Sequence, residues 1–258
     1  MFQKMAIIAL LAFSYSASAA LVKSDIEYKI GSQTMQGYLV YDDANKGKMP
    51  GVLVVHDWLG LTDKTKERAD QVAALGYVAF AADVYGKGLR GTDNKSGNEL
   101  STPYKENRKK FREHLKAAMK EFKKQKMLES SKVAVIGYCF GGAGAVELAR
   151  SGEKLKGVVS FHGGLDSPTP KDGKNIKAPV LALHGADDPF VKAEDLAAFE
   201  NEMRTHKVDW QLVKYGNSVH SFTDKTAGTD NSKGQAYNAV ADARSWEAMK
   251  DFLAGVFK

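Results

Sequence analysis

The residues from Ser131 to Arg150 constrain the fold most strongly, because they predict a strand, a sharp turn and a helix in succession. Val133–Ile136 is a short apolar run typical of a buried strand, and Gly144–Arg150 is typical of the start of a helix. Cys139, the only cysteine of the chain, lies between them with a glycine two positions away on each side. A residue at such a corner has a strained backbone and needs small neighbours. The pattern predicts a G-x-S-x-G elbow in which cysteine replaces serine.

Gly137 and Gly141 provide those small neighbours. The corner is expected to hold the sulfur of Cys139 above the edge of a sheet. It also points the backbone N–H groups at the start of the following helix, beginning with Phe140, at the space where an oxyanion would develop. A lone cysteine can instead be a small buried apolar residue. The two glycines in this strand-turn-helix setting favour a nucleophile.

Predicted strands and helices alternate along the rest of the chain. An antiparallel hairpin is expected from Asp25–Ile30 and Met35–Tyr41, followed by buried strands at Gly51–His56, Tyr77–Ala81, Val133–Ile136, Gly157–Phe161, Val180–His184 and Asp209–Tyr215. Helices are expected at Thr62–Leu75, Lys105–Lys126, Ala193–Lys207 and Gln235–Phe257, and Gly86–Pro103 is expected to be a loop rich in Gly, Asn and Ser. This order predicts an α/β fold with a mostly parallel central sheet, an antiparallel N-terminal hairpin and helices on both faces.

Residues 1–19 are expected to be a signal peptide. Lys4 gives a weak positive charge, Met5–Phe13 is a short apolar core, and Ala17-Ser18-Ala19 fits a cleavage site. We therefore expect an exported protein, periplasmic or secreted, whose residues 20–258 form a single domain. No other segment is apolar enough to be expected to cross a membrane.

The formal net charge of +6 is concentrated in the predicted helix Lys105–Lys126. A basic helix can bind nucleic acid or anionic lipid. Here Phe111, Leu115 and Phe122 follow helical spacing, which favours a helix packed on the sheet with a solvated basic face. Aromatic residues do not alternate with the basic ones as base-stacking surfaces require, so no nucleic-acid partner is expected.

A cysteine nucleophile needs a base, and the base needs an acid to orient it. In parallel sheets such groups gather at the carboxyl ends of the strands. Asp187 and Asp188 follow the predicted strand Val180–His184, and His220 follows the last predicted strand. Asp188, three residues beyond the turn glycine, is favoured as the acid, and Asp187 is expected to be a loop or solvent residue. The chain order of nucleophile, acid and histidine is that of α/β-hydrolases.

A second oxyanion donor is expected from the loop after the strand Gly51–His56. The backbone N–H of Trp58 is the natural candidate, because it must converge with the N–H of Phe140. The Trp58 side chain is also expected to pack beside the site or form a wall of the substrate pocket.

Taken together, these motifs resemble the dienelactone hydrolase family from about Ser24 to the C-terminus. The similarity is carried by Gly137–Gly142, His56–Leu61, Asp83–Gly86, His220-Ser221-Phe222 and Ser245-Trp246. The resemblance implies a triad of Cys139, His220 and Asp188. It also implies cleavage of ester or lactone bonds of small molecules through a covalent thioester, without a metal or organic cofactor.

Three positions depart from the family pattern. Where the best-studied members have a glutamate that contacts the thiol, this chain has Asp57, which is either a shorter thiol-contacting acid or a loop-capping residue. Two arginines of the family bind a substrate carboxylate, and the matching positions here are Lys87 and Asp224. Lys87 keeps the charge but loses the bidentate fork, so it is a candidate substrate-binding residue. Asp224 has the opposite sign.

Other function classes fit less well. Gly137–Gly144 has the spacing G-x-x-x-G-G-x-G, which does not match a dinucleotide-binding loop, and the six histidines form no H-E-x-x-H motif, so no metal is expected. The main alternative is a catalytically inactive small-molecule-binding protein on the same fold. The complete set of Cys139, Asp188 and His220 argues against it. A monomer or a weak homodimer is expected.

Overall fold

The protein is built around one mixed β-sheet. The computed structural model describes residues 21–258, so the predicted signal peptide lies outside the described residues. These residues contain an eight-stranded sheet of order β1-β2-β4-β3-β5-β6-β7-β8. The strands are β1 (Leu21–Ile30), β2 (Gln33–Asp42), β3 (Met49–Val55), β4 (Val78–Ala82), β5 (Leu128–Tyr138), β6 (Val158–Phe161), β7 (Val180–Gly185) and β8 (Trp210–Tyr215). The β1–β2 and β2–β4 pairs are antiparallel, and every pair from β4 to β8 is parallel.

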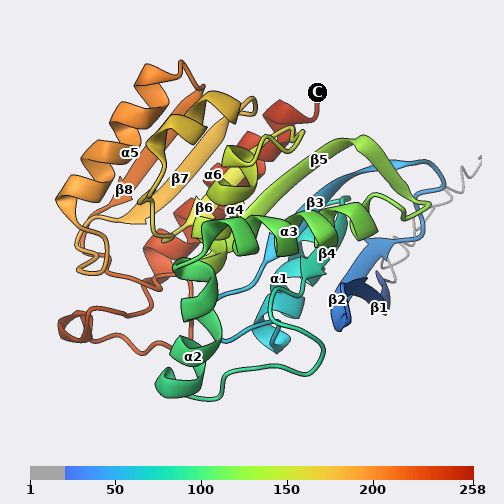
Figure 1. The fold of residues 1–258 in the computed structure, drawn as a ribbon, viewed down its shortest axis with the longest axis horizontal. Coiled ribbons are helices and arrows are strands. Elements are labelled where there is room, and N and C mark those ends of the chain that lie inside the picture. The colour runs from blue at the N-terminus through green and yellow to red at the C-terminus, as the bar shows by residue number, and fades with distance from the viewer. Residues whose placement is uncertain (1–20) are drawn as a thin grey trace, which may run out of the picture.

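Helices cover both faces of this sheet, as Figure 1 shows for α3 and α4 in front and α6 behind. One apolar core contains Phe111, Leu115 and Val146 from the front helices, and a second contains Val72 and Leu253 from the back helices. The helices are α1 (Asp63–Ala73), α2 (Asn94–Lys105), α3 (Arg108–Phe122), α4 (Phe140–Arg150), α5 (Ala193–Thr205) and α6 (Ala239–Val256). The predicted α/β-hydrolase architecture is confirmed.

The sequence prediction was wrong at 86–103, where a loop was expected and helix α2 occupies Asn94–Lys105. Asp93 caps this helix by accepting a hydrogen bond from the N–H of Ser96, and the Ser96 hydroxyl accepts one from the N–H of Asp93. This reciprocal capping box satisfies the free N–H groups of the first turn and offsets the poor helix propensity of the segment. Helix α2 lies against the Trp58 loop, because a Cβ at Gly97 would be 3.1 Å from the Trp58 ring.

The far end of α4 is fixed by buried charges. The Arg150 side chain is 1% exposed and bonds to Glu147 at 2.9 Å and to Glu202 of α5 at 2.5 Å. Because removing either partner would leave an uncompensated buried charge, these bonds hold α4 in a fixed orientation. Within residues 21–258, no helix is both long and apolar enough to cross a membrane.

Candidate active site

Cys139 lies at the corner between β5 and α4 with φ 54° and ψ −116°, a strained conformation for a residue with a side chain. A Cβ at Gly137 would be 1.9 Å from the carbonyl oxygen of Gly141. A Cβ at Gly141 would be 2.3 Å from the carbonyl oxygen of Val55 in β3. The backbone on both sides of Cys139 is therefore too tightly packed for any side chain larger than that of glycine.

Three side chains from distant parts of the chain meet at this corner. His220 Nε2 is 3.1 Å from Cys139 Sγ, and His220 Nδ1 is 2.8 Å from Asp188 Oδ2. The Asp188 carboxylate is buried and also accepts a hydrogen bond from the N–H of Phe190 at 2.9 Å. Asp187 is exposed. The arrangement of sulfur, imidazole and carboxylate has the geometry of a nucleophile, a base and an orienting acid.

The charges at this corner keep His220 protonated. Burial lowers the pKa of His220, but the negative charge of Cys139 and the hydrogen bond to Asp188 outweigh it and raise the pKa to about 10. This imidazolium lies within hydrogen-bond distance of the sulfur of Cys139. The imidazolium can then give its proton to a leaving group.

Trp58 and Phe140 both line the cleft that contains Cys139. Phe140 is the first residue of α4, so its N–H has no partner within the helix, and within residues 21–258 no acceptor is found for the N–H of Trp58 either. The Tyr85 hydroxyl donates a hydrogen bond to the carbonyl oxygen of Trp58 at 3.0 Å and so fixes the loop that carries this N–H. The role of these two N–H groups as the donors of an oxyanion hole stays a prediction.

Sequence reasoning assigned no role to His56, whose ring holds the loop that carries Trp58 in place through two hydrogen bonds. Its Nε2 accepts a hydrogen bond from the N–H of Val84, and its Nδ1 lies 2.6 Å from the carbonyl oxygen of Asp57, to which it donates. Complete burial lowers the pKa of His56 to about 4, so the ring stays neutral. The position of His56 directly after β3, at the edge of the sheet where the site forms, could have indicated this role.

Sequence reasoning also assigned no role to His162, which lies beside His220. It follows β6, has φ 39°, and packs its ring edge-to-face on His220 with 5.2 Å between the ring centroids. The Thr223 hydroxyl lies 2.8 Å from its Nε2. Burial holds the pKa of His162 well below its usual value, so a neutral ring orients His220 without competing for its proton.

The carboxylate of Asp57 is engaged in its own loop. Its Oδ1 accepts a hydrogen bond from the N–H of Leu59 at 2.8 Å, which is the loop-capping role. Within the described part of the chain, no hydrogen bond joins Asp57 to the sulfur of Cys139. Burial raises the pKa of Asp57. A thiol-contacting role for Asp57 stays a prediction.

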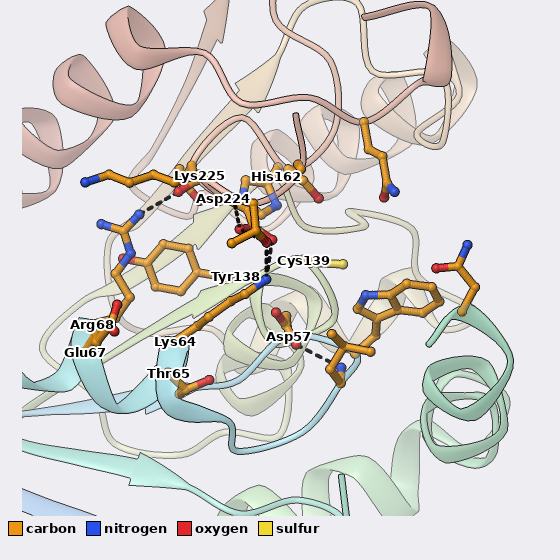
Figure 2. Close-up of a pocket in the computed structure, with 18 of the residues that line it drawn as sticks. Asp57, Lys64, Thr65, Glu67, Arg68, Tyr138, Cys139, His162, Asp224 and Lys225 are labelled. Carbon is orange, nitrogen blue, oxygen red and sulfur yellow. Dashed lines mark hydrogen bonds and ion pairs between the residues drawn. The ribbon is translucent and has the colours of Figure 1, made fainter. Parts of the chain in front are cut away.

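Lys87, the candidate substrate-binding residue, is absent from the lining of the cleft beside Cys139, and its role in substrate binding stays a prediction. Its side chain forms an ion pair with Glu27 of β1, and it lines neither of the two cavities beside Cys139. Glu27, its ion-pair partner, belongs to the N-terminal hairpin and is far from Lys87 in sequence, so sequence reasoning did not anticipate this pair. Asp224 does line a cavity beside Cys139, where it pairs with Lys64 at 2.8 Å (Figure 2).

The cleft above Cys139 has two lobes. The first lobe, of about 490 Å³, contains Asp57, Tyr138 and His162, and Figure 2 shows it with Lys64 and Arg68 among its walls. The second lobe, of about 710 Å³, contains His220 together with Phe140 and Phe190. Both are lined by Trp58, Asn94, Cys139, Ser221 and Gln235, so they meet at the sulfur. The cleft is large enough for a small organic molecule that spans the thiol.

Comparison with known proteins identifies the family of this chain. The model of the dienelactone hydrolase family matches residues 35–257. The chain belongs to the dienelactone hydrolase family. A putative carboxymethylenebutenolidase of Aquifex aeolicus is 26% identical over 238 residues, which cover 90% of this chain and 98% of the relative.

Two solved structures of dienelactone hydrolase type are more similar. One, named m3DLH, is 39% identical, has a TM-score of 0.89, and is matched over 93% of this chain and 100% of its own. The other is a dienelactone hydrolase-like promiscuous phosphotriesterase, P91, from metagenomic libraries. It is 41% identical with a TM-score of 0.89 and the same coverage. As a dienelactone hydrolase-like enzyme, this protein is an ester or lactone hydrolase that acts on small molecules.

We predict that His220 titrates near pH 10 in the free enzyme and that Cys139→Ala lowers its pKa, because this variant removes the negative charge beside the ring. Since the folded-state pKa is raised, the ring holds its proton throughout the neutral range and loses it only as the pH approaches 10. Imidazole resonances followed by NMR, assigned with His220→Gln, measure both values. A His220 that titrates near its ordinary value of about 6.5 in the unmodified enzyme would contradict this electrostatic picture.

Proposed function

We propose that this protein hydrolyses carboxylic esters or lactones of small molecules through a Cys139-His220-Asp188 triad and a thioester intermediate. The proposal rests on one observation above all, the 3.1 Å contact between His220 Nε2 and Cys139 Sγ. It places an imidazole where it can share the proton of the only sulfur nucleophile in the chain.

Acylation begins with attack of the Cys139 thiolate on the ester carbonyl carbon, which forms a C–S bond and moves an electron pair onto the carbonyl oxygen. The N–H groups of Trp58 and Phe140 stabilise this oxyanion. The tetrahedral intermediate then collapses and the C–O bond breaks. The leaving oxygen takes a proton from the His220 imidazolium, and the acyl group remains on sulfur as a thioester.

Deacylation uses the same groups in reverse. His220, now neutral, removes a proton from water as the water oxygen attacks the thioester carbon. Collapse of the second oxyanion releases the carboxylic acid and restores the thiolate and the imidazolium. Asp188 keeps Nδ1 of His220 protonated, so that Nε2 always faces the reacting atoms. No metal or organic cofactor takes part in either step of the proposal.

A binding protein without activity is the less favoured alternative. Such a protein would not need a strained elbow, a buried carboxylate and an imidazole in hydrogen-bond contact. Backbone strain of this kind costs about 1–3 kcal/mol and persists where function requires it.

We expect Cys139→Ala and His220→Ala each to lower kcat/KM for 4-nitrophenyl acetate by at least about 10³-fold, because each removes a member of the triad. Asp188→Asn should also lower it strongly. Asp187→Asn is the matched control, an adjacent but exposed carboxylate that should keep most of the activity. Full activity of Cys139→Ala would overturn the proposal, and so would intact-mass spectra of the unmodified enzyme, quenched during the burst, with no acyl adduct on the thiol.

We propose hydrolysis of aryl phosphotriesters as a second activity of the same site. It is favoured by the 41% identity to P91, which is named a promiscuous phosphotriesterase. Thiolate attack on phosphorus would form a P–S bond and expel the aryl alkoxide, which His220 protonates. Water would then cleave the P–S bond to give a dialkyl phosphate.

We expect slow release of 4-nitrophenol from diethyl 4-nitrophenyl phosphate, with a rate lost in Cys139→Ala to the same extent as the esterase rate. A shared loss is expected because one nucleophile serves both reactions. Phosphotriester turnover that survives in Cys139→Ala, or that is undetectable in an enzyme active on esters, would refute this second activity.

We also propose that the protein is exported and loses residues 1–19. The proposal rests on the charge, apolar core and Ala17-Ser18-Ala19 pattern of the sequence. After expression of the full chain in a bacterial host, we expect the protein in the periplasmic or culture fraction. Its mass should be that of a chain that begins at Ala20. A full-length chain confined to the cytoplasmic fraction would contradict export.

A further inference from the structure

The net positive charge of this protein is concentrated in one segment. Between Lys105 and Lys126 the chain has ten lysine or arginine residues and three glutamates, a net charge of +7, against +6 for the whole chain. Helix α3 and the residues at its two ends therefore carry the charge, and the rest of the chain is close to neutral overall. None of these residues belongs to the proposed triad, so the proposed reaction does not explain their charge.

Helix α3 buries its apolar side chains against the sheet. Phe111, Leu115 and Phe122 are fully buried in the core on the side of the sheet where α3 lies in front (Figure 1). The opposite side of the helix therefore faces away from the sheet. None of the exposed large apolar side chains found within residues 21–258 belongs to α3, so this outer side is polar.

The two arginines of α3 are engaged with carboxylates of neighbouring elements. Arg108 pairs with Asp166 at 2.7 Å. Arg112 pairs with Glu147 of α4 at 2.7 Å and with Asp172, in the connection between β6 and β7, also at 2.7 Å. These ion pairs hold α3 against its neighbours, so the two guanidinium groups are not part of a free surface.

Three lysines occupy the exposed side of α3. Lys109, Lys116 and Lys120 are exposed and lie at positions i, i+7 and i+11, which fall on one side of a helix. Within residues 21–258 none of the three forms an ion pair, and the Lys116 ammonium donates a hydrogen bond to the carbonyl oxygen of Ser151 at 3.2 Å. We call these three lysines the basic stripe.

The two carboxylates of α3 leave the basic stripe positive. Glu121 is paired with Lys124 at 2.6 Å. Glu113 is exposed on the same side as the basic stripe and offsets one of its three charges. Lys126, just beyond the end of the helix, is exposed and adds a further positive charge. The outer side of α3 is therefore a continuous surface of net positive charge.

These features favour an anionic lipid surface over a nucleic acid as the partner. Lysine is a hydrated point charge without the planar fork that arginine uses to bind individual phosphates. Bases stack on exposed aromatic side chains, and the two phenylalanines of α3, Phe111 and Phe122, are buried. Because a helix of 15 residues is about 22 Å long, the basic stripe can contact several anionic headgroups at once.

We propose that the basic stripe docks this protein electrostatically on an anionic phospholipid surface. The ammonium groups lie among the headgroup phosphates, and because the outer side of α3 is polar, the helix rests on the surface without entering the hydrocarbon. Arg108 begins α3 and also lines the second lobe of the cleft, so docking through α3 holds the cleft close to the lipid. The docking surface is independent of the proposed hydrolysis, since it shares no residue with the triad.

Sedimentation of the purified protein with lipid vesicles tests this surface. We expect binding to vesicles of phosphatidylcholine with about one third phosphatidylglycerol, and no binding to vesicles of phosphatidylcholine alone. Raising the salt concentration from about 0.1 M to about 1 M should release the protein, because the Debye length falls from about 10 Å to about 3 Å. Equal binding to the two kinds of vesicle, or binding that survives at high salt, would overturn the proposal.

Lys116→Gln combined with Lys120→Gln should lower the lipid partition coefficient about 25-fold, since each lysine near an anionic surface contributes about fivefold. Glutamine keeps the helix propensity of lysine. The matched control is Lys192→Gln combined with Lys214→Gln, which neutralises two exposed lysines before α5 and in β8 and should bind like the unmodified protein. Equal losses in the two double variants, or no loss in the first, would reject the basic stripe as the docking surface.

Failure of the docking surface is distinguishable from failure of the proposed function. The double variant of Lys116 and Lys120 should turn over 4-nitrophenyl acetate within about twofold of the unmodified enzyme, which shows that its fold is intact. Cys139→Ala should bind anionic vesicles like the unmodified protein, so docking is measured without turnover. Binding of double-stranded DNA at about 0.1 M salt, without binding of anionic vesicles, would reject the lipid surface in favour of a nucleic acid.

Discussion

Close packing of backbone against backbone at the nucleophile corner is the constraint on which the rest of the structure depends. Gly137 meets the carbonyl of Gly141, and Gly141 meets the carbonyl of Val55 in the neighbouring strand, so β3, β5 and α4 are locked together. This contact forces Cys139 into a conformation that a side chain rarely adopts. The strain is tolerated because the surrounding sheet and helix leave no alternative, and it presents the sulfur at the strand end.

Everything that acts on the sulfur is positioned by that sheet. Because β5, β6, β7 and β8 are parallel neighbours, the loops that follow them open at one edge. Those loops bring His220 within hydrogen-bond distance of both Asp188 and Cys139. On the other side of β5, the loop after β3 places Trp58 in the lining of the same cleft. The electrostatic outcome is an imidazolium with a pKa of about 10 beside the thiol.

The ionisable side chains around the triad are either neutral or paired with other protein groups. The unpaired charge near the reacting atoms is therefore confined to the triad itself. His56 and His162 are kept neutral by burial. Arg68 and Lys64 are bonded to carbonyl and carboxylate oxygens.

Local sequence determined the parts of this protein that depend on short-range geometry. Glycine spacing predicted the corner at Cys139, alternating strands and helices predicted the sheet, and the distance of Asp188 from its turn glycine distinguished it from Asp187. Helix α2 was missed because its capping box at Asp93 and Ser96 outweighs an unfavourable composition.

Only the tertiary structure decided which side chains share a space. It turned Lys87 toward Glu27 of the N-terminal hairpin, brought His162 against His220, and placed Arg108 of α3 in the cleft. These outcomes depend on partners that are remote in the chain. The spacing of residues along the sequence does not predict such contacts, because the order of the strands in the sheet determines which remote residues lie close together.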